Sequence, residues 1–180
     1  MSTGKEIYEQ TKYEYLSKDK FSYEQDPEQF DRAFRQLCKY PPERKTADVE
    51  RIIVDFLKFK GFLATRQETK GRMIDNTKIG TDSIGRLQVY GSKQWIPGTS
   101  KKGKADVRAS IYGVTVEIEV KFSKGDKQRE SQKQYEAELT SGGGIYMIVK
   151  NGADFIEKFD SLMNHPKIIL NRDFELNKNS

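Results

Sequence analysis

Apolar and polar residues alternate most regularly between residues 114 and 121. The positions expected to face a core are Val114, Val116, Ile118 and Val120, and those expected on the opposite face are Thr115, Glu117, Glu119 and Lys121. This period of two predicts a β-strand. The preceding Tyr112-Gly113 predicts a two-residue turn, in which glycine supplies a positive φ. The stretch from about 105 to 121 is therefore predicted to be a β-hairpin.

The turn sets the register of this hairpin, because the strands pair outward from it residue by residue. The opposed pairs are then Ile111 with Val114, Arg108 with Glu117, and Asp106 with Glu119. Two carboxylates directly opposite each other repel, so Asp106 and Glu119 are expected to hold a cation between them. Lys121 projects from the same face as Glu119. Arg108 and Glu117 are expected to form an ordinary salt bridge on that surface.

Other periodic segments predict a mixed α/β chain. Helical spacing of apolar residues predicts helices from Asp26 to about Cys38, from Thr46 to Gly61, from Asp126 to about Thr140, and over Phe155, Phe159 and Leu162. Short apolar runs predict strands at 62–66, 86–90, 145–149 and 168–170. Residues 1–23 are polar and predict a loosely held helical arm. The order α-β-(β)-β-β-α-β-α predicts a mixed central β-sheet flanked by helices.

The chain is expected to divide near its two adjacent prolines. Pro41-Pro42 separates a helical N-terminal extension, residues 1–45, from a main domain, residues 46–180. Within the main domain, the connection from about 67 to 104 is long and rich in glycine and charge, and connections of this length are often functional. It contains the lone Trp95, which either stacks on a base or covers local core.

Composition narrows the chemistry. Cys38 is the only cysteine and His165 the only histidine, so disulfide frameworks, zinc sites and histidine nucleases are excluded. A metal must be held by oxygen ligands, which favours Mg²⁺ or Mn²⁺. No apolar run approaches the roughly 18 residues needed to span a bilayer, and the first residues lack an apolar signal core. A soluble, intracellular (cytoplasmic) protein with no membrane partner is expected.

Positive charge is concentrated in one stretch. Residues 60–104 contain ten basic and three acidic side chains, a net charge of +7, although the whole chain carries only +5. A basic stretch before the carboxylate hairpin is expected where a phosphate backbone is held. A solvated lysine-rich loop is the alternative interpretation. The predicted DNA contacts in or beside this basic insert are Arg66, Arg72, Lys101, Lys102 and Lys104.

The paired carboxylates and the lysine fit the hydrolysis of a phosphodiester bond. This reaction needs a metal ion to activate water and a positive charge to stabilise the pentavalent phosphate. Asp106 and Glu119 are the predicted metal ligands, and the backbone carbonyl of Val120 is a third. Lys121 is predicted to orient or deprotonate the attacking water and to stabilise the transition state.

Asp106 followed by Glu119-Val120-Lys121 on adjacent strands resembles the PD-(D/E)XK nuclease superfamily. Between Thr46 and Lys150 the chain is also similar to the VRR-NUC branch and related phage nucleases, on the motifs Gly103-Lys104-Ala105-Asp106, Ser131-Gln132-Lys133-Gln134-Tyr135 and Gly142-Gly143-Gly144. Ala105 stands where proline is usual in this family. The resemblance implies a restriction-endonuclease-like core of order α-β-β-β-α-β, so that residues 46–180 form a nuclease domain with a basic insert at about 67–104.

The resemblance also adds site residues. Gln132 and Tyr135 match a glutamine and an aromatic residue on the helix after the Glu-Xaa-Lys strand, which implies a supporting catalytic role for Gln132 and a DNA contact for Tyr135. Glu50 matches a glutamate on the first core helix of these enzymes and is predicted to point toward the sheet. The alternatives are a solvated helix position for Gln132 and a simple helix-dipole preference for Glu50.

The expected function is that of a Mg²⁺- or Mn²⁺-dependent DNA endonuclease. The resemblance implies branched or junction DNA as the substrate, a homodimer that cuts two strands, and a phage or mobile-element origin. Two alternatives stay open: a catalytically inactive nuclease-fold DNA-binding protein, and a nuclease directed at RNA or nucleotides. The intact Asp106, Glu119 and Lys121 argue against the first alternative.

Overall fold

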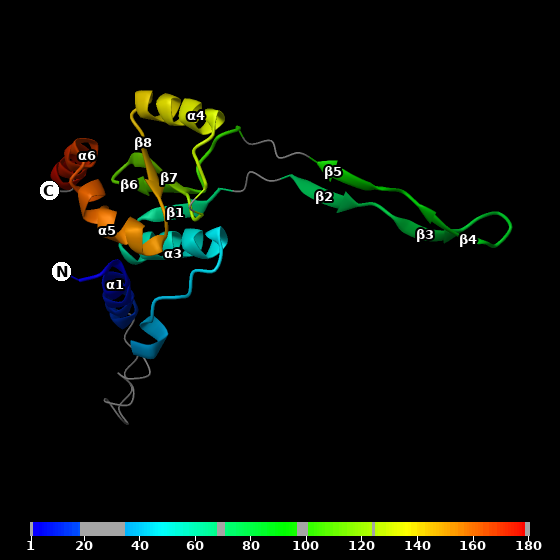
Figure 1. The fold of residues 1–180 in the computed structure, drawn as a ribbon, viewed down its shortest axis with the longest axis horizontal. Coiled ribbons are helices and arrows are strands. Elements are labelled where there is room, and N and C mark those ends of the chain that lie inside the picture. Colours follow the sequence, from blue (N-terminus) through cyan, green and yellow to red (C-terminus); the bar gives the residue numbers. More distant parts are fainter. Residues whose placement is uncertain (1, 19–34, 68–70, 97–100, 124, 179–180) are drawn as a thin grey trace.

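A computed structural model describes residues 2–18, 35–67, 71–96, 101–123 and 125–178 (Figure 1). Its helices are α1 (Gly4–Lys18), α3 (Thr46–Phe59), α4 (Glu130–Ser141), α5 (Gly152–Met163) and α6 (Pro166–Lys178). Its strands are β1 (Leu63–Arg66), β2 (Arg72–Asp75), β3 (Lys78–Thr81), β4 (Leu87–Tyr90), β5 (Lys93–Ile96), β6 (Val107–Ile111), β7 (Val114–Val120) and β8 (Ile145–Val149). The chain is therefore mixed α/β, as predicted.

Four strands form the central sheet, in the order β1-β6-β7-β8. The pairs β1–β6 and β6–β7 are antiparallel, and β7–β8 is parallel, so the sheet is mixed. Helices α3 and α5 lie along one face and α4 lies across the other (Figure 1). The parallel pair requires a crossover, and α4 supplies it. This arrangement confirms the predicted mixed sheet flanked by helices.

The hairpin has the predicted turn and register. Ile111 pairs with Val114, and Arg108 pairs with Glu117. Both turn residues have positive φ, 47° at Tyr112 and 76° at Gly113. A turn with two positive φ angles matches the twist of antiparallel strands and therefore holds the register. Asp106 stands directly before β6, where the same register brings it beside the end of β7.

The core lies between the sheet and the helices α1, α3 and α5. The apolar stripe of α3 packs there against the alternating apolar residues of β7. Helix α1 joins the same core through Tyr8, whose buried ring meets Tyr40 and Phe59 edge-on at centroid distances of 5.3 and 5.8 Å. The prediction that residues 1–23 are loosely held is therefore wrong for α1, because Tyr8 is buried in the core. The helix predicted from Asp26 falls mostly outside the described residues.

The basic insert folds into a two-stranded ribbon that projects from the rest of the molecule (Figure 1). β2 pairs with β5, and β3 pairs with β4 further out, both antiparallel. We call residues 71–96 the arm and the other described residues the body. The predicted strand at 86–90 corresponds to β4, but the remaining strands of the arm were not predicted. Four-residue strands that pack on no core carry only a weak alternation.

Two boundaries differ from the sequence prediction. The predicted edge strand at 168–170 belongs to α6, because Pro166 opens a helix and Ile168 is its buried residue. The helix predicted from Asp126 begins only at Glu130, after a turn in which the Asp126 amide donates to the Ser123 carbonyl. None of the helices among the described residues is long and apolar enough to cross a membrane.

Candidate active site

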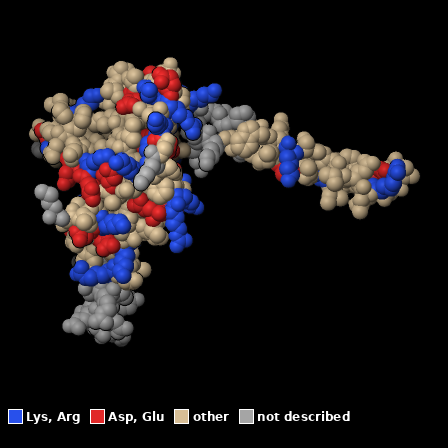
Figure 2. Space-filling model, viewed as in Figure 1, with Lys and Arg blue, Asp and Glu red and all other residues tan. Residues whose placement is uncertain are grey.

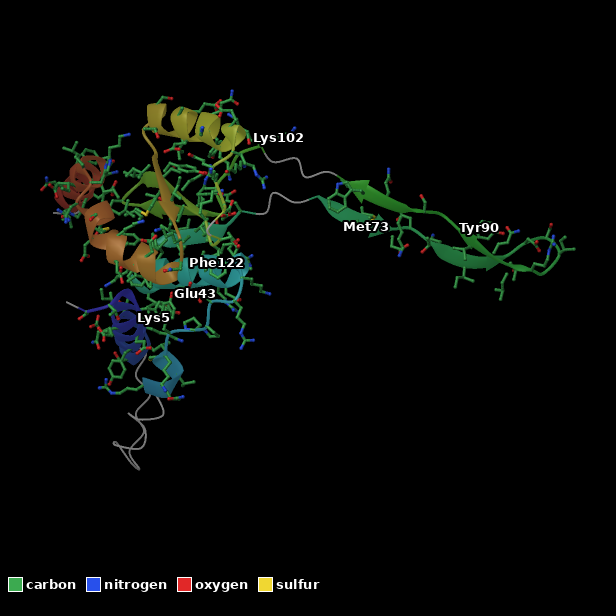
Figure 3. All side chains as sticks on the ribbon, in the orientation of Figure 1. Lys5, Glu43, Met73, Tyr90, Lys102 and Phe122 are labelled. Atoms are coloured by element: carbon green, nitrogen blue, oxygen red, sulfur yellow. The ribbon has the colours of Figure 1, made fainter. Side chains whose placement is uncertain are left out.

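A cleft of about 550 Å³ opens where the carboxylate end of the hairpin meets the N-terminus of α4 and the segment 101–104. Asp106, Glu119, Val120, Lys121 and Gln132 all line it, as does Thr46 at the start of α3. Residues from four separate parts of the chain therefore converge on one cavity. Lys102, which marks one wall, lies near the first turn of α4 where the arm leaves the body (Figure 3).

Asp106 is tied to the neighbouring strand. Its Oδ2 accepts a hydrogen bond of 2.8 Å from the Val120 backbone amide. The pKa of Asp106 is raised to about 6, chiefly by burial and further by the nearby carboxylates of Glu119 and Glu50, while the hydrogen bond from the Val120 amide and the charge of Lys121 oppose the rise. Repulsion between Asp106 and Glu119 is therefore one cause of the raised pKa of Asp106, and a bound cation would offset it.

Glu119 is held on one side only. Its side chain is almost completely buried, and Oε1 accepts from Gln132 Nε2 at 2.5 Å and contacts Lys121 Nζ at 2.9 Å. The other oxygen, Oε2, is buried and has no hydrogen-bond partner within the described part of the chain. A buried carboxylate oxygen without a partner is costly. This oxygen is therefore a free acceptor for a cation.

Lys121 and Gln132 complete the cluster. The Lys121 side chain is 11 % exposed, and its ammonium lies 3.2 Å from Gln132 Oε1 and 3.4 Å from Asp126 Oδ1. Gln132 Oε1 also accepts from the Arg129 backbone amide at 2.9 Å, which closes the first turn of α4. The helix start thereby fixes the amide that reaches Glu119. Gln132 is a cluster residue, and the alternative of a solvated helix position is wrong.

The donor set suits a magnesium-like ion. Among the residues that the structure describes, no group of three or more His, Cys, Asp or Glu side chains is arranged to hold a metal. The predicted set contains two such side chains, Asp106 and Glu119, with the Val120 carbonyl beside them. Mg²⁺ keeps several waters and is commonly bound by one or two carboxylates together with substrate phosphates. The partnerless Oε2 of Glu119 fits such an ion.

A second buried cluster lies behind the first, and it corrects two predictions. Glu117 is fully buried, and its Oε1 accepts from Arg108 Nη2 at 2.5 Å and from the Tyr135 hydroxyl at 2.7 Å. The Arg108–Glu117 pair therefore joins a fully buried carboxylate to an arginine that is 44 % exposed, and is not the ordinary surface bridge that was predicted. Burial and the bond to Glu117 raise the pKa of Tyr135. Tyr135 is the buried residue of α4 and faces the sheet cluster, so the predicted direct contact between Tyr135 and DNA does not fit its burial.

Ala105 takes part in the same cluster. Its backbone amide points at Glu117 Oε2 over 3.5 Å. A proline at this position would have no amide hydrogen to donate. The alanine that departs from the family pattern therefore suits this chain's own buried glutamate.

Glu50 points inward from α3 as predicted, but it has a partner. Arg66 Nε on β1 donates to Glu50 Oε2 at 2.6 Å. Glu50 does not line the cleft, although its charge contributes to the raised pKa of Asp106. Arg66 is correspondingly occupied by Glu50, and a contact to DNA would have to compete with this ion pair.

The predicted DNA-binding lysines lie at the root of the arm. Lys101, Lys102 and Lys104 line the cleft, and Lys101 also pairs with Glu138 on α4. Gly103 holds this segment in place with a φ of 87°, and a Cβ there would stand 2.0 Å from the Ser131 carbonyl oxygen. Arg72 lies on β2 at the inner end of the arm, and its side chain is outside the described part. Lys and Arg side chains gather near this root (Figure 2).

Sequence reasoning missed several contributors. Asp126 and Arg129 line the cleft from the turn before α4, and Tyr146 on β8 pairs in register with Glu117. The Tyr146 hydroxyl is buried without a hydrogen-bond partner in the described residues. Burial and the nearby Glu119 raise its pKa well above the usual range. The alternation places Glu117 on the same face as Glu119, and this was the signal in the sequence that Glu117 belongs beside the carboxylate pair.

Comparison with known proteins adds no identification: no family model and no curated protein sequence matches the chain. The chemistry of the cleft is therefore inferred from its own geometry and from the resemblance of its motif.

Proposed function

We propose that the chain is a Mg²⁺- or Mn²⁺-dependent endonuclease that hydrolyses DNA phosphodiester bonds in the cleft. The observation that carries this proposal is the convergence of Asp106, Glu119 and Lys121 on one cleft, together with a buried Glu119 oxygen that has no hydrogen-bond partner among the described residues. The sheet order and the crossover helix α4 are compatible with a restriction-endonuclease-like core. The cations at the root of the arm suit a polyanionic substrate.

Asp106, Glu119 and the Val120 carbonyl are the groups that would hold the ion. When bound, a divalent ion supplies Lewis-acid activation of water and neutralises charge on the phosphate. Lys121 directs its ammonium into the same cleft, where it orients the attacking water and stabilises the negative charge that develops on the phosphate oxygens. Gln132 keeps Glu119 and Lys121 in place through one amide group.

The substrate side of the proposal is branched or junction DNA. The cleft is open along one side, and Lys102 and Lys104 line it without an ion pair among the described side chains. Free lysines at this position bind a phosphate backbone without reading its sequence. A homodimer would present two such clefts to two strands of a junction.

A cleavage assay tests the proposal. The protein is incubated with a four-way junction, a flap, a linear duplex and RNA, with Mg²⁺ or Mn²⁺ and with EDTA. We expect metal-dependent cleavage of the branched DNA, abolished by Asp106→Ala and by Lys121→Ala. Asp82→Ala and Lys78→Ala on the arm are the matched controls and should cleave normally. If Asp106→Ala and Lys121→Ala cleave as fast as the unmodified protein, the proposed mechanism is wrong.

The second candidate function is a DNA-binding protein without catalysis. It is favoured by the many hydrogen bonds and ion pairs that the cleft residues already make with one another. Salt-dependent retention of junction DNA in a gel, with no product under any metal condition, would select this alternative. If the protein cleaves RNA and none of the DNA substrates, it is a ribonuclease.

A further inference from the structure

A second cavity of about 550 Å³ adjoins the cleft. Lys121 and Asp126 line both cavities, so the two cavities are neighbours that share these side chains. The remaining wall comes from the residues after β7, from β8 and from the start of α5. Phe122 lies near that start of α5 (Figure 3). We call this second cavity the flanking pocket.

The flanking pocket has an apolar floor inside a charged site. Phe122 directly follows Lys121 and is 36 % exposed, and Ile148 is 38 % exposed. Ile148 pairs in register with Glu119, so it belongs to the same face of the sheet as the carboxylate cluster. An accessible ring beside a polar catalytic cluster is the arrangement that proteins use to stack a base.

The flanking pocket also carries cations. Besides Lys121, it is lined by Lys150 and Lys158. Lys158 pairs with Asp154 at 2.9 Å, whereas the Lys150 ammonium makes no ion pair with any described residue. The Lys150 backbone amide donates a hydrogen bond of 2.8 Å to Asp154 Oδ2 in the first turn of α5. Lys150 is therefore a positioned and available cation beside an exposed ring.

We propose that the flanking pocket binds the nucleotide next to the scissile phosphate, with its base on Phe122 and its phosphate on Lys150. This inference rests on the proposed function for the position of the scissile phosphate at Lys121. A base that stacks on Phe122 has left its own helical stack, so the pocket selects DNA with unpaired nucleotides at the cut site. Branch points and flaps supply such nucleotides, and a continuous duplex does not.

The test measures binding in an Asp106→Asn background, so that the substrate stays intact. The probe is single-stranded oligo-dT, either labelled with fluorescein for anisotropy or carrying 5-iododeoxyuridine for photocrosslinking and peptide mapping. We expect a crosslink at Phe122, and we expect Phe122→Leu to weaken binding about fivefold or more, because base stacking on a ring is lost. Phe122→Tyr keeps the ring and should bind within about twofold. Lys150→Gln should lower the salt dependence by about one phosphate contact.

Phe174→Leu, which removes an exposed aromatic residue of α6 that lines neither cavity, is the matched control and should leave binding unchanged. Unaltered binding by Phe122→Leu, with crosslinks mapping elsewhere, would overturn the proposal. The cleavage assay separates this failure from that of the proposed function. Cleavage that needs Asp106 and Lys121 but is indifferent to Phe122 refutes the flanking pocket alone. Phe122-dependent binding by a protein that never cleaves refutes the nuclease and retains the pocket.

Discussion

The strands of the body and those of the arm lie in opposite surroundings. In β7, one face meets the core and the other is covered by α4, so every residue except Thr115 is buried. In β4 and β5 every residue is exposed, including Leu87, Val89 and Trp95. The alternation of apolar and polar residues thus identifies a strand and its two faces, whereas the burial of each face depends on which other elements pack against it. A β-strand in the body gains burial that its counterpart in the arm lacks.

Charge is also organised differently in the two regions. The body holds a fully buried carboxylate, Glu117, paired with the partly exposed Arg108, and it holds a buried Glu119 oxygen that has no hydrogen-bond partner among the described residues. The carboxylates of the arm are paired with exposed cations, the half-buried Asp82 with Arg86 and the exposed Asp75 with Lys93. Few charged side chains appear along the arm (Figure 2). The lysines of the insert that line the cleft, Lys101, Lys102 and Lys104, follow the arm in the chain and do not belong to its strands.

The largest expected difference is between the loss of a cleft residue of the body and the loss of the arm. Asp106→Ala should lower cleavage by roughly 10³-fold or more, because a ligand of the activating ion is lost. Replacing residues 71–96 by a short Gly-Ser linker should leave cleavage within about tenfold, since these residues do not line the cleft. Rates on one branched substrate, with circular dichroism of each variant, check this. Equal losses would mean that the arm belongs to the active site.

The next effect compares acids of the two regions. Glu117→Ala should destabilise the protein by about 3–5 kcal/mol, because Arg108 and Tyr135 lose their common buried acceptor. Urea unfolding measures the free energy. Glu117→Gln retains an acceptor and should lose less, and Asp82→Ala on the arm should leave the unfolding midpoint where it is. A mild effect of Glu117→Ala would show that the cluster is hydrated in solution.

A pair of isoleucines tests the hydrophobic part of the comparison. Ile118 on β7 is 0 % exposed, and Ile79 on β3 is 77 % exposed. Ile118→Ala should cost about 2–5 kcal/mol of unfolding free energy, whereas Ile79→Ala should change it by no more than about 0.5 kcal/mol. Thermal and urea unfolding of the monomeric protein check both values. A large cost at Ile79 would reveal that the exposed face of the arm is covered in solution.

The smallest effect is the pH dependence of Asp106. Its pKa of about 6 in the folded protein lies above the ordinary value of 3.8, so the folded state holds the proton more tightly. The stability of the metal-free protein should therefore fall as pH rises from about 4 through 6 and stay low above it. Asp106→Asn should remove this loss, because an amide still accepts from Val120 and carries no charge.

Thermal melts in EDTA from pH 4 to 8 measure this difference. Mg²⁺ at pH 8 should raise the melting temperature of the unmodified protein and leave that of Asp106→Asn unchanged. If the two proteins respond alike to pH, the opposed carboxylates do not repel in the way the geometry indicates.

Local patterns predicted the hairpin and part of the site. The Tyr112-Gly113 turn and the period of two were sufficient for the register, and the register was sufficient to bring Asp106 beside Glu119. The extent of the arm and the edge of α4 could not be predicted in this way. Short strands that pack on no core leave a weak pattern, and α4 begins where the Gln132 side chain closes its first turn.

The sequence by itself determined which side chains share a face of the hairpin, because a strand repeats every two residues and a tight turn admits one pairing. Only the tertiary structure decided what those side chains meet. α4, from later in the chain, covers Glu117 and delivers Gln132 to Glu119, and α3 delivers Glu50 to Arg66 instead of to the cleft. The burial of a side chain and its hydrogen-bond partners depend on segments distant in sequence, whereas the register of the hairpin depends on residues close to the turn.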